Sequence, residues 1–279
     1  MFAPAPALPP VSLESAYIQV RAAVKPAEDP ISILNRDATP AEKLAALEAL
    51  HASLPFAPQA RRTKGLDAMR GVAVSPAEAP AVRAKALMYM GYAVPVVGDE
   101  GARDAAVRAL LDSTRGPAYR VFALRGLAPA THDLPSAVEE LFQTTLLDLL
   151  IQTLSTEERI TALVALDAFV RAREDLPKRR PDLIAALQAV LLVPIEADPA
   201  AFAASGPPSA RSLTLAVVWH SARNRAMNGE AAALVRVNAL LTTLEVLETD
   251  AAVRAQIAAF LAAPPPKLLP CFRKHSVYR

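Results

Sequence analysis

The chain has 279 residues, of which 59 are Ala and 37 are Leu, while aromatic residues make up only 5%. Ala and Leu favour helices, whereas strands need β-branched and aromatic residues, so this composition disfavours a β-sandwich, a β-barrel and a glycine-looped nucleotide-binding fold. The formal net charge of +2 comes from 30 basic and 28 acidic side chains, a balance that is unusual for a dedicated nucleic-acid or anionic-membrane binder.

The N-terminal sequence MFAPAPALPP lacks the basic region and the long apolar core of a signal peptide. We interpret residues 1–11 as an Ala/Pro-rich tether. The default expectation is a cytoplasmic protein, and the alternative is an exported protein whose signal has been removed. No apolar run approaches the roughly 18 residues that span a bilayer. The single cysteine, Cys271, excludes an intramolecular disulfide and a multi-cysteine zinc site.

Six segments align without gaps and recur about every 40 residues. They are PAEKLAALEAL (40–50), PAVRAKALMYM (80–90), PAYRVFALRGL (117–127), TEERITALVAL (156–166), PSARSLTLAVV (208–218) and AAVRAQIAAFL (251–261). The fourth place of each is basic, and we call these residues the anchors: Lys43, Arg83, Arg120, Arg159, Arg211 and Arg254. Places 3, 7, 8 and 11 share one helix face, so each segment predicts an amphipathic helix. Capping-box spacing at Thr39–Glu42, Ser75–Glu78 and Ser155–Glu158 predicts helix starts.

A second set of helices is expected between these segments, near 12–24 and at 59–72, 101–112, 136–153, 181–192 and 230–247. Helix pairs at this period cannot bury their apolar faces alone, so we predict an all-α fold, a right-handed α-solenoid of about six helix pairs. One domain is expected over 12–263, followed by a Pro-rich, basic tail at 264–279. The 52-residue spacing between Arg159 and Arg211 predicts an insertion near 193–208. We interpret it as a solvated loop that holds one short helix or none, with a flap over the solenoid edge as the alternative.

The order of helix, acidic or proline-containing turn and Val-Arg-x-x-Ala-x-x-x-Leu resembles HEAT repeats, including the HEAT-like type of the phycobilisome lyases. TDAAVRAQIAAFL (249–261) and SPAEAPAVRAKALMYMG (75–91) carry the resemblance best. It implies a ladder of pairs between a turn carboxylate and the anchor of the same copy. The implied pairs are Asp37 with Lys43, Asp112 with Arg120 and Asp250 with Arg254, with Glu78 and Glu157 as substitutes in the second and fourth copies. Some HEAT-like proteins are bilin lyases or DNA glycosylases, but no specific residue transfers either activity to this chain.

No sequence motif predicts catalysis. The chain has no P-loop, dinucleotide fingerprint or nucleophile elbow. Its four histidines, His51, His132, His220 and His275, show no metal-ligand spacing. We therefore expect a non-enzymatic protein with no catalytic residue, no metal and no cofactor.

A candidate partner-binding surface follows from the repeat. In HEAT repeats the second helix of each pair lines the concave face, and places 6, 9, 10 and 13 point away from the core. The residues at such places are Lys85, Met88, Tyr89, Tyr92, Phe122 and Arg125. Met, Tyr, Phe and Arg are enriched in binding patches, so we expect a groove for a protein or peptide. The competing interpretation is that they pack between neighbouring repeats.

Two basic clusters suggest a different partner. They comprise Arg61, Arg62 and Lys64, and Lys178, Arg179 and Arg180. If they form one continuous concave stripe, a nucleic-acid-binding solenoid is favoured, and if they scatter over loops, the protein-binding scaffold is favoured. A further alternative is an accessory subunit of a HEAT-like enzyme such as a lyase.

Overall fold

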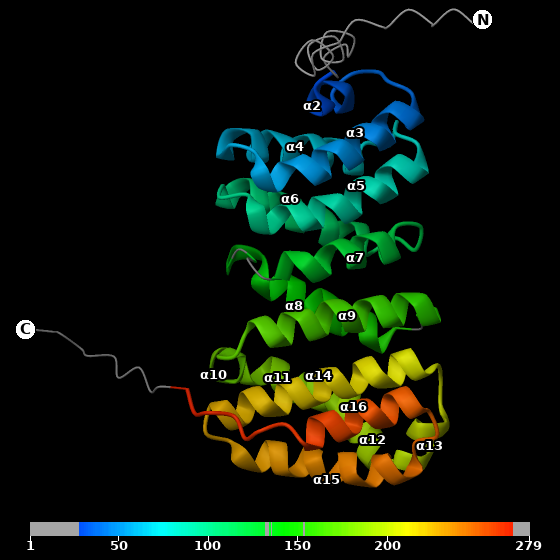
Figure 1. Ribbon diagram of the computed structural model, residues 1–279, viewed down its shortest axis with the longest axis vertical. Coiled ribbons are helices and arrows are strands. Elements are labelled where there is room, and N and C mark those ends of the chain that lie inside the picture. The colour runs from blue at the N-terminus through cyan, green and yellow to red at the C-terminus, as the bar shows by residue number, and fades with distance from the viewer. Residues whose placement is uncertain (1–27, 132–133, 135, 153, 270–279) are drawn as a thin grey trace, which may run out of the picture.

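The computed structural model describes residues 28–131, 134, 136–152 and 154–269. Within these ranges the chain is all-helical and contains no strand. Figure 1 shows the helices from α2 to α9 stacked in chain order from the N-terminal end, while α14, α15 and α16 pack on one another at the other end. None of the described helices is long and apolar enough to cross a lipid bilayer.

One layer consists of the six helices that contain the anchors, and we call it the anchor layer. Its helices are α3 (Pro40–Ser53), α5 (Pro80–Ala93), α7 (Arg120–Ala130), α9 (Thr156–Ala172), α14 (Pro208–Met227) and α16 (Ala251–Leu261). Each of them packs against the next one in this series. The repeated segments are therefore neighbours in space, although about 40 residues separate them in sequence.

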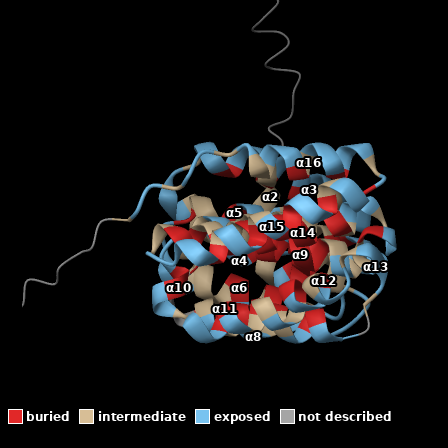
Figure 2. Ribbon diagram, turned by 90° about the horizontal axis from the view of Figure 1, so that it is seen from below, coloured by how far each residue is buried: buried red, intermediate tan, exposed pale blue. Residues whose placement is uncertain are grey.

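The second layer contains the helices that alternate with the anchor helices. They are α4 (Gln59–Val74), α6 (Glu100–Ser113), α8 (Ser136–Ile151), α11 (Pro181–Leu187) and α15 (Ala231–Leu247). Contacts run from α4 to α6, from α6 to α8 and from α8 to α11, while α15 packs on α14 and α16. The core lies between the two layers and consists mainly of Leu, Ala and Val. Figure 2 shows buried residues where helices face one another and exposed residues on their outer sides.

Several short elements lie at the ends of these helices. They are α2 (Pro30–Leu34), the 3₁₀-helices η1 (Leu54–Phe56) and η2 (Val94–Val96), α10 (Leu176–Arg179), the π-helical turn η4 (Gln188–Leu192), α12 (Val193–Ala197) and α13 (Pro199–Ala204). The sequence pattern did not predict α2 or α10, because neither is long enough to show a helical period.

The insertion is not the solvated loop that we expected. Two short helices, α12 and α13, occupy most of 193–208. Asp198 caps α13 by accepting a hydrogen bond from the Ala201 N–H, and Pro199 stands at its first position. Pro194 offers no N–H to the carbonyl four residues earlier, in η4, and a π-helical turn is a common way to absorb such a defect.

Two of the three predicted capping boxes are confirmed. Thr39 with Glu42 caps α3, and Ser155 with Glu158 caps α9. The third is wrong, because residues 76–78 form a turn and α5 begins only at Pro80. This turn leaves the Glu78 carboxylate available to another helix.

The predicted tether at 1–11, the helix near 12–24, Cys271, His132, His275 and most of the tail lie outside the described residues. Residues 264–269 follow α16 without regular secondary structure and run back along α14 (Figure 1), where the Leu269 N–H donates a hydrogen bond to the Met227 carbonyl at 2.8 Å. That carbonyl belongs to the last residue of α14, where helices leave backbone acceptors without an internal partner.

Candidate partner-binding face

The anchors form a ladder, but not the one that the HEAT resemblance implies. Four anchors contact the turn or helix start that precedes the next anchor, rather than the turn of their own copy. These contacts are Lys43 with Glu78, Arg83 with Tyr119, Arg120 with Glu158 and Arg211 with Glu248. The ladder therefore joins successive copies and fixes their spacing.

Among the described residues, none of the implied pairs within one copy forms, and Lys43 contacts Glu78 instead of Asp37. Asp250 caps α16 through the Ala252 and Val253 N–H groups, so its carboxylate is engaged in the helix start. Asp112 lies near Arg115 on the surface instead of contacting Arg120. An anchor side chain is long enough to reach the next copy, where it contacts a carboxylate or, in the case of Arg83, the Tyr119 ring.

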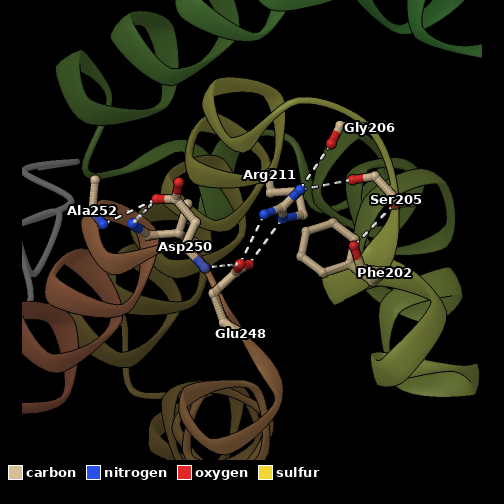
Figure 3. Close-up of polar contacts among 8 residues, drawn as sticks. Phe202, Ser205, Gly206, Arg211, Glu248, Asp250 and Ala252 are labelled. Atoms are coloured by element: carbon tan, nitrogen blue, oxygen red, sulfur yellow. Dashed lines mark hydrogen bonds and ion pairs between the residues drawn. The ribbon is translucent and has the colours of Figure 1, made fainter.

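The most buried rung joins Arg211 of α14 to Glu248, which follows α15 (Figure 3). The side chains are only 8% and 2% exposed. The guanidinium donates two hydrogen bonds to the carboxylate, at 2.9 Å and 2.7 Å, and two more to the carbonyls of Ser205 and Gly206. The Arg211 hydrogen bonds, aided by the Asp250 N–H, lower the pKa of Glu248. This rung also ties the end of the insertion to α14.

The first part of the candidate surface is an aromatic cluster of three residues, His51, Tyr89 and Tyr92. The His51 ring stacks on Tyr89 with centroids 4.2 Å apart, and Tyr92 lies 5.4 Å from His51 at a tilted angle. Tyr92 is 50% exposed. Burial, and then the positive charge of Lys85, lower the pKa of His51. The cluster thus presents a neutral, mostly apolar patch across α3 and α5.

Lys85 lies beside this cluster and is already paired. Its ammonium lies 3.2 Å from the Glu48 carboxylate and 4.9 Å from the Tyr89 ring centroid. Contacts with Tyr89 and Glu48 raise the pKa of Lys85. Because its charge is matched locally, the patch carries little net charge.

The remaining predicted residues are Met88, Phe122 and Arg125. Met88 and Phe122 are half-buried, and Phe122 packs on the edge of the core. Arg125 is exposed and pairs with Glu157 of α9 at 2.8 Å. None of the six predicted residues is fully buried, and they lie on the neighbouring helices α5 and α7.

The C-terminal half of the anchor layer carries a polar cluster that the sequence analysis missed. Asp167 of α9 accepts a hydrogen bond from the His220 ring at 2.7 Å and pairs with Arg171 at 2.9 Å. Asp167 is a charged residue in an otherwise apolar helical segment, and it is buried. An acidic residue within an Ala/Leu-rich segment was the sequence feature that could have indicated this cluster. Beside it, Trp219 stacks on Phe260 with centroids 4.6 Å apart.

Residues 264–269 lie against the C-terminal part of α14. The Arg223 guanidinium lies 5.2 Å from the Trp219 ring centroid and donates a hydrogen bond to the Pro264 carbonyl at 3.1 Å. Met227, one turn later, accepts the hydrogen bond from Leu269. Arg223 and Met227 share one side of α14, so residues 264–269 follow that side as an extended segment. We use the name outer face for the surface that His51, Tyr89, Arg125, His220 and Arg223 contribute to the anchor layer, and none of these residues is fully buried.

The two basic clusters are engaged within the chain. Arg61 pairs with Asp29, and Arg62 donates to three backbone carbonyls. Arg179 pairs with Glu139 and Asp175, and Arg180 pairs with Asp182, which lowers the pKa of Asp182 to about 2. Lys64 is in α4 and Lys178 is in the short α10. The clusters therefore belong to separate elements, and most of their charges have an acidic or carbonyl partner.

Among the described residues, no group of three or more His, Cys, Asp or Glu side chains could hold a metal ion. No known protein family matches the sequence, and neither does any curated protein. Two crystal structures of engineered proteins, both targets of the Northeast Structural Genomics Consortium, are similar in fold. The first is 18% identical with a TM-score of 0.56 and is matched over 85% of this chain and 96% of its own. The second is 15% identical with a TM-score of 0.54, over 89% of this chain and 58% of its own. These likenesses concern the fold alone.

Proposed function

We propose that the chain is a HEAT-like, right-handed α-solenoid that works as a non-enzymatic scaffold and binds an extended segment of a partner protein on its outer face. In this proposal the outer face is the concave surface, and the stacked pairs supply an extended, rigid platform. The period of the anchors and the stacking of the anchor helices in chain order support this architecture.

The observation that carries the proposal is the segment 264–269 on α14. It is held by backbone groups, since a carbonyl accepts from Arg223 and an N–H donates to Met227. Backbone contacts of this kind do not depend on the sequence of the bound segment. The outer face therefore accommodates an extended, proline-containing chain at one end, and we infer that it holds a similar segment elsewhere.

The aromatic cluster is the best place for such a segment. Tyr92 is exposed, and the half-buried rings of Tyr89 and His51 lie beside it. Proline-rich peptides pack on aromatic surfaces of this kind, because these peptides are already extended and lose little entropy on binding. The pairing of Lys85 with Glu48 and of Arg125 with Glu157 leaves the patch with little net charge. We therefore propose an uncharged, proline-containing peptide as the ligand.

Fluorescence anisotropy with labelled proline-containing decapeptides tests this proposal on the full chain. We expect one or more peptides to bind, and we expect the double substitution Tyr89→Ala with Tyr92→Ala to weaken binding about tenfold or more, as at aromatic hot spots. The matched control is Val246→Ala, which removes an 85% exposed apolar side chain from α15 in the other layer.

Two results would contradict the proposal. One is equal binding by the double variant and the control, provided that circular dichroism shows both folded. The other is the absence of binding by any peptide. Nothing in the described part of the chain favours the nucleic-acid alternative. Most residues of the two basic clusters already form ion pairs or hydrogen bonds within the chain.

A further inference from the structure

The anchor of the fourth copy, Arg159, interrupts the ladder. The other anchors that are followed by a further copy contact Glu78, Tyr119, Glu158 or Glu248 ahead of that copy. Ahead of α14 the corresponding position holds Ser205, Gly206 and Pro207, which carry no acidic group. Among the described residues, none forms a hydrogen bond or an ion pair with the Arg159 guanidinium.

Arg159 lies at the edge of a cavity of about 400 Å³ that is open to solvent, and its side chain is exposed. The cavity is lined from α9, η4, α12, α13, the turn after α13 and α14. Its apolar wall consists of Leu154, Val190, Leu191, Ile195 and Phe202, and Arg159 belongs to the same lining. The cavity exists because α12 and α13 lengthen the connection between α9 and α14.

Polar contacts connect the elements that line the cavity to α14 and α15. Arg236 of α15 pairs with Glu196 of α12. Arg211 donates hydrogen bonds to the Ser205 and Gly206 carbonyls in the turn after α13 (Figure 3). Arg211 also lines the cavity, but its charge is matched by Glu248. Arg159 is therefore the cation of this lining that has no anionic partner among the described residues.

We propose that this cavity binds a small carboxylic acid with an apolar body, such as a medium-chain fatty acid. Its carboxylate pairs with Arg159 and takes the place that Glu78, Glu158 and Glu248 occupy in the other rungs. Its apolar body lies against the wall that contains Val190 and Phe202. The volume is in the usual range for a pocket that takes a small molecule. This inference is independent of the peptide-binding face.

Isothermal titration of the full chain with decanoate tests the proposal. Arg159→Gln removes the unmatched charge, and we expect it to weaken decanoate binding tenfold or more, since charge-assisted hydrogen bonds are the stronger class. The matched control is Arg254→Gln, which removes an exposed anchor of α16 that does not line the cavity. The control should bind decanoate as the unsubstituted chain does. Decanol, which has the same body without the charge, should bind tenfold or more weakly.

A second variant tests the site from the opposite direction. Ser205→Glu supplies a carboxylate at the interrupted rung, so it should abolish decanoate binding and raise the melting temperature by pairing with Arg159. The proposal is overturned if the unsubstituted chain does not bind decanoate, if Arg159→Gln binds it as tightly as Arg254→Gln does, or if decanol binds as tightly as decanoate. Undiminished binding by Ser205→Glu would also overturn it.

Discussion

Gly91 of α5 and Gly126 of α7 bring the backbones of these two helices into direct contact. A Cβ atom placed on Gly91 would lie 1.9 Å from the Gly126 carbonyl oxygen, and one placed on Gly126 would lie 2.5 Å from the Leu87 carbonyl oxygen. Both clashes are with backbone, which cannot rotate away as a side chain can. This contact sets the distance between the two helices that carry Tyr89 and Phe122, and thus the geometry of the proposed peptide site.

We expect Gly91→Ala to lower the free energy of unfolding by about 3 kcal/mol, because α5 and α7 must move apart to admit the methyl group. Gly71→Ala is the matched control, since nothing lies within 4 Å of its added Cβ in the interior of α4. That change should raise the free energy of unfolding by roughly 0.5–1 kcal/mol, because Ala restricts the unfolded chain. Urea unfolding measures both, and equal effects of the two substitutions would contradict the close contact.

Among the ion pairs of the described residues, we expect that breaking the pair of Arg211 and Glu248 lowers the free energy of unfolding the most. Arg211→Ala leaves the Glu248 carboxylate buried without its counter-ion, and breaking such a pair typically costs about 3–5 kcal/mol at neutral pH. Arg236→Ala is the control, because its pair with Glu196 is more exposed and should contribute about 0–1 kcal/mol. Chemical unfolding at pH 7 measures the free energy of unfolding of both variants. An equal decrease in both would contradict the larger contribution that we assign to the buried pair.

The same rung predicts a pH dependence. The folded state lowers the pKa of Glu248, so the pair contributes its full stability above the ordinary carboxyl pKa and loses it as the pH falls through the lowered value. We therefore expect the free energies of unfolding of the unsubstituted chain and of Arg211→Ala, measured between pH 7 and pH 3, to become more similar as the pH falls. A difference that stays constant over this range would contradict the assignment.

His51 reports on the aromatic cluster. Because burial and Lys85 both lower its pKa, NMR titration should place the His51 pKa below the ordinary value of about 6.5. The unfolded chain then takes up this proton first, so stability falls as the pH drops from the ordinary value to the lowered one. Lys85→Gln should raise the His51 pKa only in part, because burial is the larger cause. An ordinary pKa in the unsubstituted chain would show that the ring is not half-buried beside Lys85.

Trp219, the single tryptophan, is a spectroscopic probe of the C-terminal end of the stack. It is 7% exposed, and its ring stacks on Phe260 at an interplanar angle of 11°. Phe260→Ala should shift the tryptophan emission to the red and increase its quenching by acrylamide, since water replaces the lost ring. Phe56→Ala, at an 89% exposed position of η1, should leave the emission unchanged. An unchanged spectrum in Phe260→Ala would contradict the stacking.

Much of the local structure could be read from the amino-acid sequence. The helices at 40–53, 80–93 and 156–172 follow from the apolar period of their segments, and the starts at Thr39 and Ser155 follow from capping chemistry. These signals act within a few residues, so they do not depend on the rest of the fold. The helix spacing also predicts that Tyr89 and Tyr92 point away from the core. Tyr92 is 50% exposed, whereas Tyr89 is partly buried and packs against the core.

The tertiary structure decided which residues meet. Lys43 contacts Glu78, 35 residues later, and Asp167 contacts His220, because stacking brings together side chains whose separation no local rule encodes. The contact of Gly91 with Gly126 and the cavity beside Arg159 arise in the same way, from the packing of successive helices and from an insertion that lengthens one connection. Periodicity and capping determine where the longer helices lie in the chain, whereas the partner of each side chain depends on how closely the helices approach.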